Sequence, residues 1–157
     1  MNGQHRIANE RGESLLELLI AVAIMGIAVV AIMAGLTTSI LMSDIHRKQT
    51  AAAAGVRTYG EALENYIAGS GYTTCAGAST GTSGPYAAST VGYSVPSGYS
   101  VTATAALSWT GSAWGTCSTD SGLQKVTLRV VSSDSRASET LDVILRKPCR
   151  STDGVCS

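Results

Sequence analysis

The stretch RGESLLEL at residues 11–18 decides how this chain folds, because it joins a charged N-terminal segment to a long apolar one. From Leu18 to Met42 the sequence contains no Asp, Glu, Lys or Arg. An uncharged run of about 25 residues is long enough to cross a bilayer as a helix. The apolar core of a cleaved secretory peptide is shorter, and its cleavage site lies behind it. The sequence therefore indicates a membrane-spanning helix that stays in the mature protein.

The chain of 157 residues carries no formal net charge, and only 14% of its residues are charged. This balance argues against a basic surface that binds nucleic acid, so we expect no direct nucleic-acid contact. The sequence has no Ser-His-Asp order, P-loop or dinucleotide-binding glycine pattern. Its acidic residues are poorly spaced for a cation, so we expect no enzymatic activity, no cofactor and no metal site.

The helix is expected to continue beyond the apolar run, because no proline occurs before Pro85 and helix-forming residues fill positions 43–67. Apolar residues recur there at spacings of three and four, which places them in one stripe along an otherwise polar helix. Glycines at positions 69 and 71 predict its end. The sequence thus predicts a helix over residues 14–68, with a stripe made of Ala52, Val56, Tyr59, Leu63 and Tyr66.

The second half of the chain is expected to form a small sheet. Residues 70–98 are rich in Gly, Ser, Thr and Ala, and predict a loop region with at most a short strand at 91–95. Apolar and polar residues then alternate, which predicts strands over 99–109, 125–130 and 140–146, with Trp109 on the buried face and Trp114 on a loop. Ser133–Arg136 is the clearest turn.

These patterns predict an α+β fold, in which a long N-terminal helix packs its apolar stripe on a small antiparallel sheet. The expected organisation is a leader over 1–12, an apolar helix half over 13–42 and an amphipathic half over 43–69. A loop region over 70–98 and the sheet with a C-terminal loop over 99–157 complete the chain.

All four cysteines, Cys75, Cys117, Cys149 and Cys156, follow the apolar run and lack the spacing of a metal site. Disulfides are therefore the better interpretation. Pairing Cys75 with Cys117 and Cys149 with Cys156 would pin the long loop to the sheet and close a short C-terminal loop. The rival pairs Cys117 with Cys149, and loop closure favours neither arrangement strongly.

Glu17 has two interpretations. Ser14 and Glu17 match the S-x-x-E capping box, and a carboxylate in a first helical turn suits the helix dipole. However, Glu17 opens an apolar span, where a carboxylate is costly unless it finds a partner. If the chain were cut after Gly12, Glu13 would carry a new amino group. The amine of a neighbouring copy could then neutralise Glu17 and set the axial register of a stack of helices.

The segment GESLLELLIAVAIMGI at residues 12–27 resembles the cleavage and methylation motif of type IV pilins and type II secretion pseudopilins. The resemblance implies that a prepilin peptidase cuts after Gly12 and N-methylates Glu13, and that the Glu17 carboxylate serves in methylation and subunit docking. It also implies a long helix packed on an antiparallel sheet. The chain departs from the family at Glu13, where Phe or Met is usual, and this departure favours a specialised, minor subunit.

The leading hypothesis is therefore a structural, minor subunit of a type IV pilus-like or type II secretion pseudopilus filament. The implied partners are prepilin peptidase, other pilin-like subunits and the cytoplasmic membrane. Arg6 and Arg11 favour a cytoplasmic N-terminus. The chain would cross the membrane once, place its C-terminal part outside and then enter a filament or reach the cell surface. The alternative is a single-span membrane anchor that presents an extracellular binding or adhesion domain.

Overall fold

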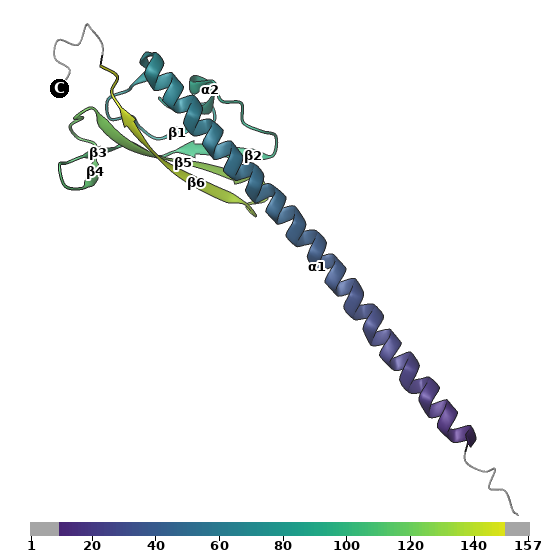
Figure 1. The fold of residues 1–157 in the computed structure, drawn as a ribbon. Coiled ribbons are helices and arrows are strands. Elements are labelled where there is room, and N and C mark those ends of the chain that lie inside the picture. Colours follow the sequence, from purple (N-terminus) through teal and green to yellow (C-terminus); the bar gives the residue numbers. More distant parts are fainter. Residues whose placement is uncertain (1–9, 150–157) are drawn as a thin grey trace, which may run out of the picture. The chain divides into compact units, whose positions relative to one another are not determined.

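The computed structural model describes the backbone of residues 10–149 and the side chains of residues 15–149. The chain divides into two compact units, Met1–Asp44 and Ile45–Ser157, which are described separately below. The first unit contains the apolar part of helix α1 (Glu10–Tyr66). The second contains the rest of α1, a short helix α2 and the whole sheet (Figure 1). This architecture confirms the predicted α+β fold, a long N-terminal helix with an antiparallel sheet.

Helix α1 begins at Glu10 rather than at the predicted Ser14. Ser14 is therefore preceded by four helical residues, and it is not the N-cap of this helix. The backbone N–H of Glu17 falls within reach of the carbonyl of Glu13, as at any interior helical position. The prediction of a capping box at Ser14 and Glu17 is consequently wrong for the uncut chain.

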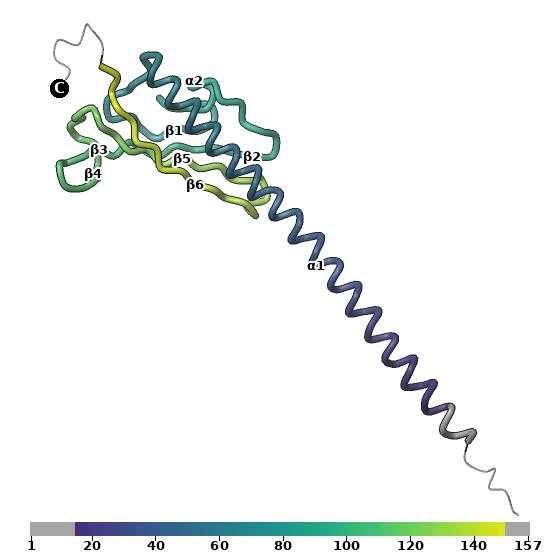
Figure 2. Tube along the Cα trace, in the orientation of Figure 1, coloured from purple at the N-terminus to yellow at the C-terminus, as the bar shows by residue number. Residues whose placement is uncertain are grey.

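The helix ends close to the glycines at positions 69 and 71, as predicted. After α1 ends at Tyr66, one π-helical turn, η1 (Ile67–Gly71), follows, and Tyr72 is extended. Ser70 within this turn has a φ of 109°, which ordinary helical residues do not adopt. Figure 2 follows the chain from this point through residues 72–98 into the sheet.

The sheet has six strands, and every pair is antiparallel. Strand β5 (Leu123–Ser132) lies at its centre. It pairs with β6 (Ser138–Arg146) along one edge, and with β2 (Tyr99–Ala103) and β3 (Leu107–Trp109) along the other. Two short strands extend the sheet, β1 (Ser79–Thr80) on β2 and β4 (Trp114–Thr116) on β3.

The predicted continuous strand over 99–109 is wrong, because one extra residue interrupts it. Ala103 pairs with Leu128, and Leu107 pairs with Lys125. Ala103 and Leu107 are four residues apart, whereas their partners Leu128 and Lys125 are three residues apart. One residue between Ala103 and Leu107 is therefore unpaired, which defines a β-bulge. An insertion of one residue moves the following side chains to the opposite face. Trp109, predicted for the core, is consequently 37% exposed.

The segment 70–98 also differs from its prediction. It contains β1 and helix α2 (Ala88–Val91), which ends at Gly92 with a left-handed φ of 77°. The short strand proposed for 91–95 does not form. The side chains of this segment instead pack on α1: the Tyr93 ring stacks on Tyr59 at a centroid distance of 5.2 Å. The sequence does not predict this packing of residues 70–98 on α1, because the buried tyrosines and alanines follow no regular spacing.

The core of the second unit lies between α1 and the sheet (Figure 1). The predicted stripe is confirmed: four of its residues are almost fully buried, and Tyr66 is partly buried. Gly60 lets helix and sheet approach closely, since a Cβ there would lie 3.0 Å from Leu141. Opposite the stripe, β2, β5 and β6 contribute Val101, Ala103, Val126, Leu128, Val130, Val143 and Leu145.

Two further bonds tie α1 to the sheet. The Lys48 ammonium lies 2.6 Å from the Asp134 carboxylate, in the predicted turn between β5 and β6. The Tyr99 hydroxyl donates a hydrogen bond to the Lys48 carbonyl at 3.3 Å. Asp134 also accepts hydrogen bonds from the Ser132 hydroxyl and the Arg136 amide. These contacts, with that of Lys48 first, hold the pKa of Asp134 well below its usual range.

The stacked tyrosines yield a matched test of the core. The Tyr59 hydroxyl donates a 2.6 Å hydrogen bond to the Tyr86 carbonyl. Burial and the neighbouring Tyr93 raise the pKa of Tyr59 to about 12, so the donor stays protonated. Within the described residues, the buried Tyr93 hydroxyl has no hydrogen-bond partner. We expect Tyr59→Phe to lower the free energy of unfolding by about 1–3 kcal/mol, because a buried carbonyl loses its donor.

Tyr93→Phe is the control, because it removes an unpaired hydroxyl of the same stacked pair and should be neutral or stabilising. Urea unfolding of the detergent-solubilised chain, followed by circular dichroism, measures both variants. Equal destabilisation by the two substitutions would contradict the assigned hydrogen bond.

Candidate functional site

The apolar part of α1 is a surface that no other described residue covers. Every described side chain from Leu15 to Met42 is exposed, and this helix is the one long and apolar enough to cross a membrane within the described residues. Burying one such aliphatic side chain contributes about 1.5–3 kcal/mol, so the whole surface favours a nonaqueous environment by tens of kcal/mol. Its large residues are Leu15, Leu16, Leu18, Leu19, Ile20, Val22, Ile24, Met25, Ile27, Val29, Val30, Ile32, Met33, Leu36, Ile40, Leu41 and Met42.

Two polar side chains near the end of this surface are satisfied within the helix. The Thr37 hydroxyl donates to the Met33 carbonyl at 2.9 Å, and the Thr38 hydroxyl donates to the Ala34 carbonyl at 3.0 Å. Hydroxyl donation to the carbonyl four residues earlier removes the need for water or an external partner. These threonines therefore suit an apolar environment.

Glu17 differs from the threonines. It is exposed, and no ion pair or side-chain hydrogen bond to it occurs among the described side chains, residues 15–149. It is the single charged residue of the segment 15–43. Gly12 and Glu13 lie in the first turn of α1, one turn before Glu17, but the side chain of Glu13 lies outside the described residues. In an apolar environment the charged Glu17 carboxylate requires a cation, and the described side chains place none beside it.

Glu17 also begins a helix face made mostly of small residues, with Ile24 as the exception. Positions spaced alternately by four and three residues from Glu17 share one side of the helix. They are Ala21, Ile24, Ala28, Ala31, Gly35 and Thr38. A Cβ placed on Gly35 would meet nothing within 4 Å, so this position is open. Small residues let two helix backbones approach closely in a membrane. A neighbouring helix on this face would therefore come near the Glu17 carboxylate.

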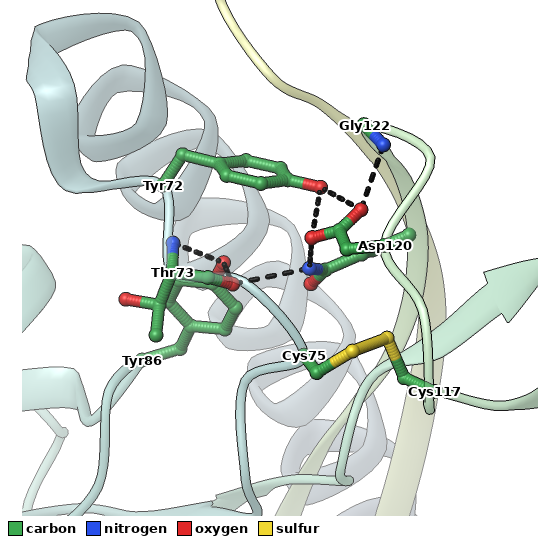
Figure 3. Close-up of a disulfide and its surroundings, with 8 residues drawn as sticks. Tyr72, Thr73, Cys75, Tyr86, Cys117, Asp120 and Gly122 are labelled. Carbon is green, nitrogen blue, oxygen red and sulfur yellow. Dashed lines mark hydrogen bonds between the residues drawn. A yellow bond between two sulfur atoms is a disulfide. The ribbon is translucent and has the colours of Figure 1, made fainter.

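The disulfide between Cys75 and Cys117 anchors the second unit (Figure 3). It excludes the rival pairing of Cys117 with Cys149. A crosslink across 42 residues stabilises the fold by about 4 kcal/mol in the chain-entropy account. Cys149 is exposed after β6, and Cys156 lies outside the described residues, so their pairing stays a prediction.

A polar cluster around Asp120 reinforces this disulfide (Figure 3). The Tyr72 hydroxyl donates to the Asp120 carboxylate at 2.9 Å, and the Gly122 amide donates at 2.7 Å. The buried Gln124 amide donates to both Asp120 and the Thr73 carbonyl. The loop after η1 is thus held to the segment before β5 by polar groups as well as by sulfur.

The cluster sets the protonation of its members. Burial opposes ionisation of Asp120, but the hydrogen bonds from Gly122, Gln124 and Tyr72 outweigh it and lower the pKa of this carboxyl. Burial, followed by the bond to Asp120, raises the pKa of Tyr72. The sequence alone does not reveal this cluster. The spacing of Asp120 and Gln124 was visible, but their partner Tyr72 is far away in the sequence.

Nothing among the described residues gathers three His, Cys, Asp or Glu side chains at a possible metal site. Within the described side chains, the arrangement is an apolar helix with one unpaired carboxylate, Glu17, and a small disulfide-bonded α+β unit. Such an arrangement is typical of a membrane-anchored protein.

Comparison with known proteins agrees with this class. The family model for the prokaryotic N-terminal methylation motif matches residues 7–33. This motif is the signature of type IV pilins and pseudopilins, and it supports a type IV pilin-like protein. It implies processing by a prepilin peptidase and assembly with other pilin subunits, in a structural rather than catalytic family. No curated protein and no solved structure matches the chain.

The Asp120 cluster predicts a specific response to acid. Because its folded-state pKa is lowered, Asp120 contributes stability above its ordinary value of about 4, and that contribution is lost as the pH falls through the folded-state pKa. We expect Asp120→Asn to lower the free energy of unfolding at neutral pH by about 1–3 kcal/mol and to flatten the acid limb of the stability profile.

Asp142→Asn is the comparison variant. The pKa of Asp142 is also lowered, chiefly by the Thr127 hydroxyl, but this carboxylate is exposed, so its substitution should flatten the acid limb less than Asp120→Asn does. Urea unfolding at a series of pH values measures both variants. An acid limb unchanged by Asp120→Asn would contradict the role assigned to the cluster.

Proposed function

We propose that the chain is a structural, minor subunit of a type IV pilus-like or type II secretion pseudopilus filament. Prepilin peptidase cuts after Gly12 and N-methylates Glu13, and the mature subunit assembles by packing its apolar helix against those of neighbouring subunits. The observation that carries the proposal is Glu17, the single charged residue of the exposed apolar segment 15–43, which begins within the matched motif.

The cut supplies the cation that Glu17 lacks. Cleavage after Gly12 creates an amino group at Glu13, four residues before Glu17, which is roughly 6 Å along a helix at 1.5 Å per residue. An adjacent subunit displaced axially by about one helical turn brings its amine level with this carboxylate. Pairing in a low-dielectric environment offsets the desolvation of both groups only when the geometry is good, so it also sets the register between subunits.

Glu13 supports the assignment as a minor subunit. After the cut, this position carries both the new amine and a second carboxylate, one turn from Glu17. Like charges at this spacing destabilise a helix by a few tenths of a kcal/mol, and the cost rises where water is excluded. This charge is tolerated better at a filament end, where few equivalent subunits pack around it, than inside a long uniform filament.

Before assembly, the subunit lies in the cytoplasmic membrane. The chain crosses once, with residues from 45 onward on the outer side, and the disulfide of the second unit suits an oxidising compartment. The helix then leaves the lipid for the filament, where the same apolar side chains contact other helices.

Replacing Glu17 tests the proposal against a simple membrane anchor. We expect Glu17→Leu to insert normally but to reduce incorporation into filaments by about 100-fold or more, because a buried unpaired amine costs about 3–5 kcal/mol. Glu61→Leu is the matched control, an exposed carboxylate on the same helix outside the apolar segment. Immunoblots of membrane and sheared filament fractions measure both. Full incorporation of Glu17→Leu into filaments would contradict the docking role of Glu17 and favour a simple membrane anchor.

A further inference from the structure

The four cysteines allow three complete pairings, and loop length does not select the one that contains Cys75–Cys117. This disulfide closes a separation of 42 residues, whereas Cys117 and Cys149 are only 32 residues apart. Because the entropy of loop closure changes slowly with length, the shorter rival loop is favoured by about 1.5-fold. The fold therefore has to provide the selectivity that loop length does not.

The rival cysteine competes locally. The Lys147 backbone N–H donates a 2.9 Å hydrogen bond to the Gly122 carbonyl. Cys149 follows Lys147 by two residues, and Cys117 precedes Gly122 by five. Strand pairing therefore ties the segment that carries Cys149 to the segment that follows Cys117, and it does not by itself favour Cys75.

One bond across the polar cluster around Asp120 bridges the segments of Cys75 and Cys117 without sulfur (Figure 3). The Tyr72 hydroxyl donates a 2.9 Å hydrogen bond to the Asp120 carboxylate. Each of these two residues is three positions from a cysteine, Tyr72 before Cys75 and Asp120 after Cys117. Hydrogen bonds to an ionised carboxylate are stronger than those between neutral groups. This bond can therefore hold the two segments together while both cysteines are still thiols.

Gln124 adds a second bridge inside the protein. Its side chain is fully buried, and its Nε2 donates to the Thr73 carbonyl at 3.1 Å as well as to Asp120. The Tyr86 hydroxyl donates to the Thr73 carbonyl at 3.2 Å and accepts from the Thr73 N–H at 3.1 Å. Thr73 is thus fixed from two sides, two residues before Cys75.

The backbone of Cys75 also depends on these contacts. Its φ is 47°, in the left-handed region that residues other than glycine rarely adopt. Burial opposes the ionisation of Asp120, but several hydrogen bonds, one of them from the Cys75 backbone N–H, lower its pKa. The following carbonyl, that of Ala76, accepts a 2.8 Å hydrogen bond from the Ala106 N–H. Polar contacts therefore hold Cys75 on both sides in a conformation that a free chain would leave.

We propose that the Asp120 cluster forms in the reduced chain and selects Cys117 as the partner of Cys75 during oxidation. Asp120 is a positioning residue here, because it acts through the placement of the two thiols. The inference stands apart from the filament proposal, since it requires only that the chain meets a thiol oxidant.

The oxidant belongs to the class of small-molecule or protein disulfides. The thiolate of one cysteine attacks the oxidant, which forms a mixed disulfide and releases one thiolate. The thiolate of the second cysteine then attacks the sulfur attached to the chain, which forms the Cys75–Cys117 bond and expels the other thiolate. Two electrons pass to the oxidant, and both cysteine protons are released. The second step is intramolecular, so the cluster favours it by holding the two thiols close together.

Refolding with open choice of pairing tests the proposal. The full chain is reduced and unfolded in urea with detergent, then refolded in a glutathione redox buffer. Digestion with trypsin and chymotrypsin without reductant, followed by mass spectrometry, measures each pairing. We expect Cys75–Cys117 to dominate, and Asp120→Asn to raise the ratio of Cys117–Cys149 to Cys75–Cys117 by about 10-fold, because charge-assisted hydrogen bonds are lost. Tyr72→Phe removes one of these bonds and should raise the ratio less, and it keeps the test valid if Asp120→Asn does not fold.

Asp134→Asn is the matched control. Asp134 also accepts several hydrogen bonds within the second unit, but it lies in the turn between β5 and β6. Its substitution should destabilise the unit and leave the ratio of pairings unchanged. An equal change of the ratio in Asp120→Asn and Asp134→Asn would overturn the proposal, because general stability would then decide the pairing.

Hydrogen exchange of the reduced chain tests whether the cluster precedes the disulfide. Mass spectrometry should find the amides of residues 72–76 and 120–124 protected in the presence of reductant. Their exchange should be about 10-fold faster in reduced Asp120→Asn. Unprotected exchange of both segments in the reduced, unsubstituted chain would overturn the proposal, because the cluster would then be a consequence of the disulfide.

Discussion

A carboxylate at the edge of an otherwise uncharged helix is the constraint on which this account rests. Glu17 is followed by about 25 residues that fit the thickness of a bilayer, and each described side chain among them is exposed. The threonines near the end of the segment satisfy their hydroxyls on their own helix. The described side chains of α1, from residue 15 onward, offer the carboxylate no such solution and no cation beside it. The methylation motif over residues 7–33 provides a source, because it implies a new amine close to Glu17.

The second unit depends on a different interaction, the burial of the α1 stripe against β5 and its neighbours. Tyr59 and Leu63 are fully buried there, and Gly60 admits the sheet to close range. A small sheet with few aromatic residues has a thin core, and such domains commonly need additional crosslinks. The Cys75–Cys117 disulfide and the Asp120 cluster link the loop after η1 to the segment before β5. The Lys48–Asp134 ion pair links α1 to the turn between β5 and β6.

The features that sequence predicted correctly are periodic. The stripe from Ala52 to Leu63 and the alternation in β5 and β6 repeat often enough to define one buried side. The failures come from single residues. One extra residue after Ala103 moved Trp109 out of the core. Residues 86–93 bury tyrosines without any period, so their packing on α1 was not visible. For the candidate site, Glu17 and the cysteines stood out by residue type, whereas the Asp120 cluster joins residues distant in sequence.

The most direct measurement is the intact mass and N-terminal sequence of the chain recovered from filaments made together with a prepilin peptidase. The account predicts a chain that begins at Glu13 and carries one methyl group on its amine, in the same fraction as sister subunits. A filament-bound chain that still begins at Met1 would contradict it, because Glu17 would then have no processed amine to meet.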